Sequence, residues 1–265
     1  MTKCLLVGDW HGSTEWAESV LDFAKSQEIT HVFHAGDFGI WPGYTGGLFL
    51  GSMIRKCQEN GITLWVTPGN HEDYSKIEDP ETEDGSVPDR QVLAGDTDSE
   101  GWEIALLPRG YRWDFGGLSF LSFGGAPSID YEHRTKDVSW WSEEMIRFSD
   151  LMRLPEERVD VMICHDAPDG GTTEVQAIID TPPHLSMWSE AGLSYARDGR
   201  MLMNKAVNAV KPRMFVHGHF HAPGFRYDKE NDCSYLSLGM NGDPANVVVF
   251  DTDEFVRNDE PKEVK

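Results

Sequence analysis

The chain has 265 residues, enough to bury the core of one large α/β domain, and its hydrophobic content of 39% is ordinary for a folded protein. Its formal net charge of −22 argues against extended nucleic-acid binding, because that binding depends on Lys and Arg neutralising phosphates. No apolar run approaches the roughly 20 residues that cross a bilayer, and the apolar N-terminal stretch is too short for a signal peptide. We therefore expect no membrane partner and a cytoplasmic location.

The first third of the sequence alternates β-rich runs with amphipathic stretches. Apolar runs predict strands over residues 3–8, 30–35 and 62–67. A helix is predicted after the first strand, and another over residues 48–60, where Gly61 is its expected stop. The β-α-β-α-β order predicts a parallel sheet with right-handed crossovers.

The rest of the chain is more mixed. Residues 79–99 are acidic and rich in Gly, Pro and Asp, which predicts a surface excursion. The polar stretch 166–199 is a candidate lid over a site. Strands are predicted over residues 103–107, 111–115, 118–123, 159–164, 214–217 and 246–251, helices over 140–154 and 200–210, and a hairpin around 228–232. We expect a single domain over residues 1–256 and a charged flexible tail over residues 257–265.

Five short polar signatures follow predicted strands. They are Asp9-Trp10-His11, Gly36-Asp37, Gly69-Asn70-His71-Glu72, His165-Asp166 and Gly218-His219-Phe220-His221. Ligands of open α/β sheets bind beyond the carboxyl ends of the strands, so we expect these loops to converge. Any one signature is weak, since a single histidine is more often a turn residue. Together and in this order they predict a metal site.

The residue types in these signatures suit a pair of divalent cations. Two cations about 3.5–4 Å apart need a bridging carboxylate, because an anion with two oxygens offsets both charges. Imidazole nitrogens and carboxylate oxygens suit Mn, Fe or Zn, and we expect manganese, with iron or zinc as alternatives. A cation pair lowers the pKa of a bridging water towards neutrality and so supplies hydroxide as a nucleophile.

The set resembles the calcineurin-like metallophosphoesterase superfamily, whose motifs D-x-H, GD, GNH-[DE], H and G-H-x-H are all intact between Asp9 and His221. The resemblance implies a four-layer α-β-β-α sandwich of two mixed sheets, with the metal site at the C-terminal ends of the strands. It also implies that Asp37 bridges the two metals and that His71 contacts the substrate phosphate or protonates the leaving oxygen. One metal would be held by Asp9, His11, Asp37 and His221, and the other by Asp37, Asn70, His165 and His219.

Residues beside the signatures are candidates for supporting roles. We expect Glu72 to support a ligand or cap a helix, and Asp166 to orient His165 through a ring nitrogen. Arg134 and Arg200 are candidates for pairing with phosphate oxygens, although a solvated surface position is the favoured alternative for both. Trp41 and Tyr44 could offer a face to a nucleobase, with ordinary packing as the favoured alternative.

The sequence also bears on the substrate. Protein phosphatases of the superfamily carry GD-x-x-D-R-G, whereas Asp37 is followed here by Phe38-Gly39-Ile40-Trp41-Pro42-Gly43, without the Asp-Arg pair. We therefore predict a phosphodiesterase that hydrolyses small phosphate esters, such as cyclic nucleotides, through a metal-bridging hydroxide. Two alternatives stay open: a phosphomonoesterase with the same metal site, and a non-catalytic metal-binding scaffold.

Overall fold

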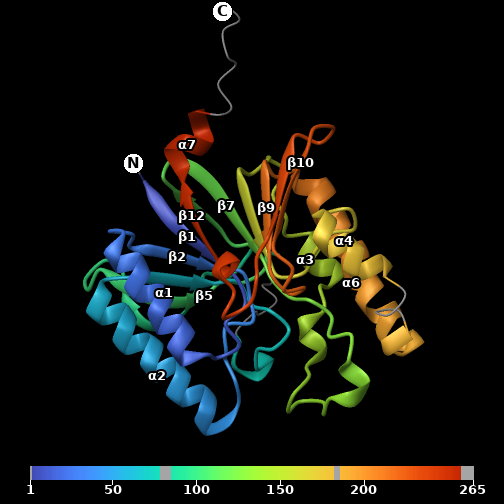
Figure 1. Ribbon diagram of the computed structural model, residues 1–265, viewed down its shortest axis with the longest axis horizontal. Coiled ribbons are helices and arrows are strands. Elements are labelled where there is room, and N and C mark those ends of the chain that lie inside the picture. Colours follow the sequence, from blue (N-terminus) through green and yellow to red (C-terminus); the bar gives the residue numbers. More distant parts are fainter. Residues whose placement is uncertain (1, 78–84, 182–185, 258–265) are drawn as a thin grey trace, which may run out of the picture.

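Two mixed six-stranded β-sheets lie between layers of helices in the computed structural model, which describes residues 2–77, 85–181 and 186–257 (Figure 1). The strand order is β12-β1-β2-β3-β5-β4 in the first sheet and β10-β11-β9-β8-β7-β6 in the second. Helices α1 and α2 cover the first sheet, while α4 and α6 lie on the opposite side of the molecule, against the second (Figure 1). This arrangement confirms the predicted α-β-β-α sandwich.

The first sheet contains the β-α-β-α-β unit expected from the N-terminal sequence. Its central strands β1, β2, β3 and β5 pair in parallel, while β12 and β4 are antiparallel edges. Gly61 has a φ of 65° and ends α2, as expected. The elements are β1 (Lys3–Val7), α1 (Thr14–Ser26), β2 (His31–His34), α2 (Gly43–Asn60), β3 (Thr63–Val66), β4 (Gln91–Asp96), β5 (Trp102–Leu106) and β12 (Val247–Asp251).

The second sheet has the same plan of a parallel centre with antiparallel edges. Strands β7, β8, β9 and β11 are parallel, and β6 and β10 form the edges. Its strands and the helices between them are β6 (Arg112–Phe115), β7 (Leu118–Phe123), α3 (Phe148–Leu151), β8 (Val161–Cys164), α4 (Thr173–Asp180), α6 (Glu190–Val210), β9 (Met214–His217), β10 (Gly224–Asp228) and β11 (Cys233–Ser237). The C-terminal helix α7 (Thr252–Arg257) follows β12 of the first sheet. Short 3-10 turns occupy Tyr74–Lys76, Tyr131–His133, Ser142–Glu144 and Pro244–Asn246.

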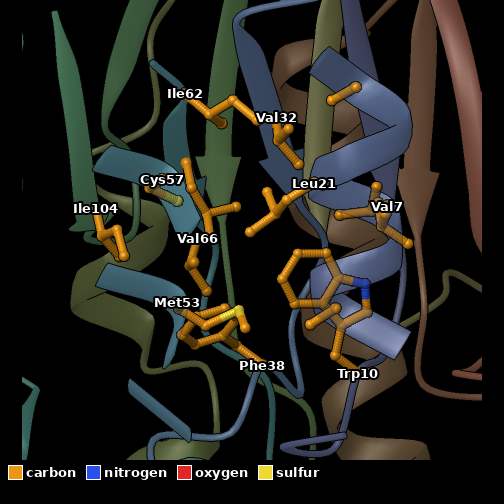
Figure 2. Close-up of a cluster of buried hydrophobic side chains, with 14 of the residues drawn as sticks. Val7, Trp10, Leu21, Val32, Phe38, Met53, Cys57, Ile62, Val66 and Ile104 are labelled. Carbon is orange, nitrogen blue, oxygen red and sulfur yellow. The ribbon is translucent and has the colours of Figure 1, made fainter. Parts of the chain in front are cut away.

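Three apolar layers hold the sandwich together. Along β1, Leu5 and Val7 face the α1–α2 side, whereas Cys4 and Leu6 face the second sheet, as the two-residue period of a strand requires. Figure 2 shows the outer layer, in which Val7, Trp10 and Leu21 pack together. A third layer packs α6 against the outer face of the second sheet. Among the described helices, none combines the length and apolar character needed to cross a lipid bilayer.

Two expectations from the sequence were wrong in part. The supposed surface excursion over residues 79–99 contains the edge strand β4, although residues 78–84 lie outside the described ranges. The predicted helix over 140–154 is reduced to the turn Ser142–Glu144 and the short α3, because Glu144 and Asp150 are buried as hydrogen-bonding partners.

The candidate lid, residues 166–199, is largely helical in its described part. It contains α4, and its last ten residues already belong to α6, which begins at Glu190. The Ser189 hydroxyl caps α6 by accepting the Gly192 N–H. Of the predicted tail, only Arg257, the last residue of α7, lies within the described residues.

A buried arginine anchors the irregular segment between β7 and α3. The Arg109 side chain donates from Nε to the Gly124 carbonyl at 2.8 Å and from Nη2 to the Glu143 carbonyl at 2.8 Å. Its Nη1 lies 3.2 Å from Oδ2 of Asp150, which is fully buried. One guanidinium thus ties both ends of residues 124–150 to the loop after β5, and this fixes the segment beside the carboxyl ends of the strands.

Replacing this guanidinium should cost measurable stability. In Arg109→Met the hydrophobic stem is kept, but the Asp150 carboxylate and the carbonyls lose a charged donor, so we expect the free energy of unfolding to fall by about 3 kcal/mol. Urea denaturation followed by tryptophan fluorescence measures this change. Arg112→Met is the control, because Arg112 pairs with Glu157 at the surface and its loss should cost less than about 1 kcal/mol. Equal losses in the two variants would contradict the anchoring role.

Candidate metal centre

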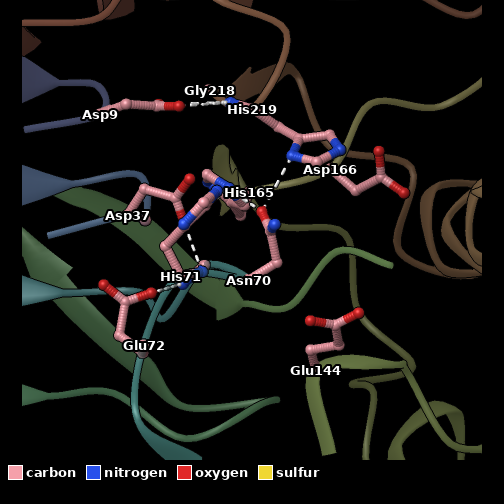
Figure 3. A network of polar contacts seen from close by, with 12 residues as sticks. Asp9, Asp37, Asn70, His71, Glu72, Glu144, His165, Asp166, Gly218 and His219 are labelled. Carbon is pink, nitrogen blue, oxygen red and sulfur yellow. Dashed lines mark hydrogen bonds and ion pairs between the residues drawn. The ribbon is translucent and has the colours of Figure 1, made fainter. Parts of the chain in front are cut away.

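The five signatures converge at one edge of the sandwich. Asp9 follows β1, Asp37 follows β2 and Asn70 follows β3, all in the first sheet, while His165 follows β8 and His219 follows β9 in the second. Parallel strands end at the same edge, so both sheets deliver their polar loops to one place. Figure 3 shows these side chains pointing toward one another.

One group of four side chains has the geometry of a cation site. Potential ligand atoms of Asp9, His11, Asp37 and His221 all lie within 4.8 Å of one another. His221 Nε2 lies 3.0 Å from Asp9 Oδ2, and His11 Nε2 lies 3.4 Å from Asp37 Oδ2. The resemblance to the metallophosphoesterases implied these four residues for one metal.

A second group meets on the other side of Asp37. The Asn70 side-chain oxygen lies 3.0 Å from His165 Nε2 and 3.0 Å from His219 Nδ1. His165 Nε2 is also 3.2 Å from Asp37 Oδ1. Asp37 therefore turns Oδ2 toward the first group and Oδ1 toward the second, which is the arrangement of a bridging carboxylate.

The electrostatics of the centre require positive charge. Asp9 and Asp37 are buried, and burial alone would raise the pKa of Asp37, but His165 and His71 hold it well below its usual range. Burial lowers the pKa of His11 and of His165, yet the Asp37 carboxylate outweighs it and raises them to about 9 and about 10. Either protons on these imidazoles or bound cations can compensate the carboxylates. The donor set of imidazole, carboxylate and amide oxygen fits Mn, Fe or Zn.

The backbone of the centre is held in an unusual conformation. Four residues of the centre have positive φ values: 46° for His11, 55° for Asp37, 67° for His219 and 54° for His221. These values lie in the left-handed region, which costs a residue other than glycine about 1–3 kcal/mol. Part of the restraint comes from the Asp37 carbonyl, which accepts the N–H groups of Trp10 and His11 at 3.0 and 2.8 Å. These strained positions coincide with four of the candidate ligands.

Two motif glycines allow close approach to the carboxylates. A Cβ atom on Gly218 would collide with the Asp9 carboxylate, and one on Gly69 would collide with the Asp37 carboxylate and backbone. The absence of a side chain also lets the His219 N–H reach Asp9, 3.1 Å from Oδ2, and the His71 N–H reach Asp37 Oδ1 at 2.9 Å. The glycines of the GNH and GHxH motifs are therefore explained by packing.

Hydrogen bonds orient the histidine rings. His165 Nδ1 donates to the Ala35 carbonyl at 2.7 Å, so its Nε2 faces Asn70 and Asp37. His11 Nδ1 lies 3.1 Å from the Asn241 side-chain oxygen, which likewise turns Nε2 inward. The expectation that Asp166 orients His165 was wrong, because Asp166 Oδ1 accepts the N–H of Ala167 instead.

A chain of buried hydrogen bonds orients Asn70. Its amide Nδ2 donates to Ser128 Oγ at 3.0 Å, and Ser128 Oγ donates to Glu144 Oε2 at 2.7 Å. Because the NH2 group is taken by Ser128, the amide oxygen faces His165 and His219. Sequence reasoning missed Ser128, Glu144 and Asn241, since no local motif marks residues whose partners are distant in the chain.

Glu72 links two of the loops. Its Oε1 accepts the N–H groups of Phe38 and Gly39 at 2.6 and 3.2 Å, and its Oε2 accepts that of Gly69 at 2.6 Å. The buried carboxylate thus supports the loops that carry Asp37 and Asn70. The alternative of a helix cap was wrong, because Asp73 caps the following 3-10 turn.

His71 lies beside Arg134. Arg134 Nη2 is 3.2 Å from His71 Nε2, and Arg134 Nε is held by Asp130 Oδ1 at 2.8 Å. A guanidinium can only donate, so His71 Nε2 accepts and the ring carries its proton on Nδ1. Burial, together with the charge of Arg134, lowers the pKa of His71 against the opposing effect of Asp37. Arg134, a candidate from sequence, is thus in contact with the site.

The two aromatic candidates are placed differently. The Trp41 ring packs over Gly12, next to His11, where a Cβ atom would touch it. The Tyr44 side chain is 81% exposed at the start of α2. No hydrogen bond or ring contact within the described residues joins Tyr44 to the centre. Trp41 therefore borders the candidate metal centre, whereas the structure does not bring Tyr44 to it.

Known proteins share this sequence pattern and fold. A sequence model described as calcineurin-like phosphoesterase matches residues 2–223. Among curated protein sequences, none matches the chain. A dimetal phosphatase from Danio rerio superposes with a TM-score of 0.51 at 12% identity, over 94% of this chain and 91% of that one. The protein TT1561 of Thermus thermophilus superposes with a TM-score of 0.50 at 9% identity, over 94% and 98%.

The hydrogen bond from Asn70 to Ser128 provides a test of the centre. Ser128→Ala frees the Asn70 amide to rotate, so we expect roughly ten- to a hundredfold weaker Mn²⁺ binding to metal-stripped protein. Isothermal titration calorimetry measures the affinities of the filled sites. Ser142→Ala is the matched control, since the Ser142 hydroxyl is exposed and bonds only its neighbour Glu143 among the described residues. Unchanged affinity in Ser128→Ala would show that Ser128 does not support a ligand.

Proposed function

The chain belongs to the calcineurin-like phosphoesterase family, and from this premise we propose that it is a dinuclear metal-dependent phosphodiesterase of small phosphate esters, such as cyclic nucleotides. The observation that carries the proposal is the position of Asp37, whose two oxygens face two different groups of ligands. A carboxylate so placed suits a pair of cations.

The proposed ligands follow the two groups of side chains. Asp9, His11 and His221 would hold one cation with Asp37, and Asn70, His165 and His219 would hold the other. We propose manganese, with iron or zinc as alternatives. When bound, the cations supply Lewis acidity and activate water for attack on phosphorus.

His71 and Arg134 are proposed to act on the substrate. Because the Arg134 guanidinium lies against His71, a phosphate oxygen beside the imidazole would also be within reach of Arg134. Asp130 holds the guanidinium in place from its other side. His71 would move a proton to the departing oxygen, and Trp41 would border the substrate next to His11.

Charge favours a diester over a monoester. A diester carries one negative charge, whereas a monoester carries nearly two at neutral pH. A chain of net charge −22 therefore repels the monoester more strongly than the diester. The chain also lacks the Asp-Arg pair of protein phosphatases after Asp37. We propose a cytoplasmic location, because Cys4, Cys57, Cys164 and Cys233 are free and buried, which suits a reducing compartment.

Metal removal and restoration test the activity. We expect metal-stripped protein to be inactive, and Mn²⁺ to restore hydrolysis of bis(p-nitrophenyl) phosphate and of a 2′,3′-cyclic nucleotide in preference to p-nitrophenyl phosphate. Initial rates of nitrophenolate release, with chromatography for the nucleotide, give the order of kcat/KM. Preference for the monoester would indicate a phosphomonoesterase, and no turnover with both sites filled would indicate a scaffold.

Substitutions separate metal binding from proton transfer. Asp37→Ala should abolish binding of the metal pair, whereas His71→Ala should leave both metals bound and lower turnover by about 10²–10⁴-fold. Metal content and kcat on an ester with a poor leaving group measure the two effects. His133→Ala, an exposed histidine of the same loop region as Arg134, is the control and should change neither. Full activity of His71→Ala on that ester would exclude the acid role.

A further inference from the structure

A cavity of about 190 Å³ opens beside the metal centre, and His219 is part of its wall. The neighbouring wall residues are apolar and come from the segment after β7, from α4, from α6 and from the loop after β9: Pro127, Ile129, Ile178, Ala196 and Phe220. Asp166 and Arg200 complete the lining. Since His219 belongs both to the cavity and to the second ligand group, whatever fills the cavity lies next to that group.

Asp166 gives this cavity a specific polar feature. Its side chain is 1% exposed, and Oδ1 accepts the Ala167 N–H at 2.8 Å. Oδ2 has no hydrogen-bond partner among the described residues. A buried carboxylate oxygen without a donor is costly, so a donor from a bound molecule would be strongly favoured. Figure 3 shows Asp166 beside His219, with its carboxylate outside the cluster of metal-site residues.

The surroundings of Asp166 indicate the charge of that donor. Arg200 lines the same cavity and is held by a 3.0 Å contact from its Nε to Asp169 Oδ1. Its positive charge already offsets the Asp166 carboxylate across the cavity, which favours a neutral donor over a second cation. Gly199 packs closely against Pro127 beside Asp166, because a Cβ atom there would collide with the Pro127 ring and lie 3.4 Å from Asp166 Oδ2.

We propose that this cavity binds one ester arm of the substrate, and that the arm is an apolar chain carrying a neutral hydrogen-bond donor, an amide N–H or a hydroxyl, which donates to Asp166 Oδ2. The inference rests on the proposed phosphodiesterase function and narrows its substrate class. The arm contacts the apolar wall, and its donor forms a hydrogen bond with Asp166. Its phosphate end then lies beside His219, next to the candidate metal ligands. Asp166 is then a specificity-determining residue.

Binding of phosphonates tests the proposal apart from catalysis, because their P–C bond is not an ester. We compare 4-acetamidobutylphosphonate with 4-acetoxybutylphosphonate, in which oxygen replaces the N–H, and with methylphosphonate, which has no arm. Calorimetry on the Mn²⁺-loaded chain measures the three affinities. We expect the amide to bind about ten- to a hundredfold more tightly than its ester analogue.

Two variants test whether Asp166 causes the preference for the amide and whether the cavity holds the arm. Asp166→Asn should abolish the preference for the amide, because Asn keeps its oxygen on the Ala167 N–H and turns its NH2 group to the cavity, while methylphosphonate affinity stays unchanged. Ile178→Trp fills the cavity without altering Asp166, and should reduce both long-arm ligands to the affinity of methylphosphonate.

Several outcomes would overturn the inference. Equal affinity for amide and ester in the unsubstituted chain, or an amide preference that survives Asp166→Asn, would mean that water alone satisfies Asp166. Long arms that add nothing over methylphosphonate would mean that the cavity does not receive the arm. Failure of the proposed function shows itself differently, as absent ester hydrolysis in the Mn²⁺-restored protein, so the two failures are distinguishable.

Discussion

The centre depends on the burial of two carboxylates at the ends of adjacent parallel strands. β1 delivers Asp9 and β2 delivers Asp37, and both side chains are removed from water. Their charges cannot stay together in a low-dielectric environment without positive charge between and around them. Three features support this arrangement. Imidazoles surround the carboxylates, four candidate ligands have a left-handed backbone, and two glycines let neighbouring N–H groups approach the carboxylates. A cation pair is the compensation that this donor chemistry suits.

The second sheet supplies the remaining candidate ligands of the centre. His165 and His219 come from β8 and β9, so the candidate ligand groups exist only if the two sheets pack in one relative position. The apolar layer between the sheets fixes that position, with Leu6 and Phe33 from one side and Phe120 and Val216 from the other. The same fold occurs in structures that are only 9–12% identical to this chain.

The irregular segment over residues 124–150 connects stability with the proposed chemistry. Arg109 fixes its two ends, and between them lie Ser128 and Glu144, which orient Asn70, and Arg134, which contacts His71. Glu144 is buried in this segment and accepts the hydroxyl of Ser128, which in turn accepts the amide of Asn70. Most of the segment lacks helical backbone hydrogen bonds, and hydrogen bonds of its buried side chains stabilise it instead.

The sequence by itself determined most of the strands, their order along the chain and the residues that meet at the strand ends. Strand periodicity is local, and parallel strands bring their carboxyl ends to one edge, so the order of residues along the chain is enough to group Asp9, Asp37 and Asn70. Contacts between distant residues were decided by the tertiary structure alone. Asn70 finds Ser128, and His165 finds Ala35 rather than Asp166, because packing of the two sheets sets which atoms face each other. For the same reason the helix predicted over 140–154 and the excursion predicted over 79–99 were wrong in part: buried partners and an edge-strand pairing outweighed local composition.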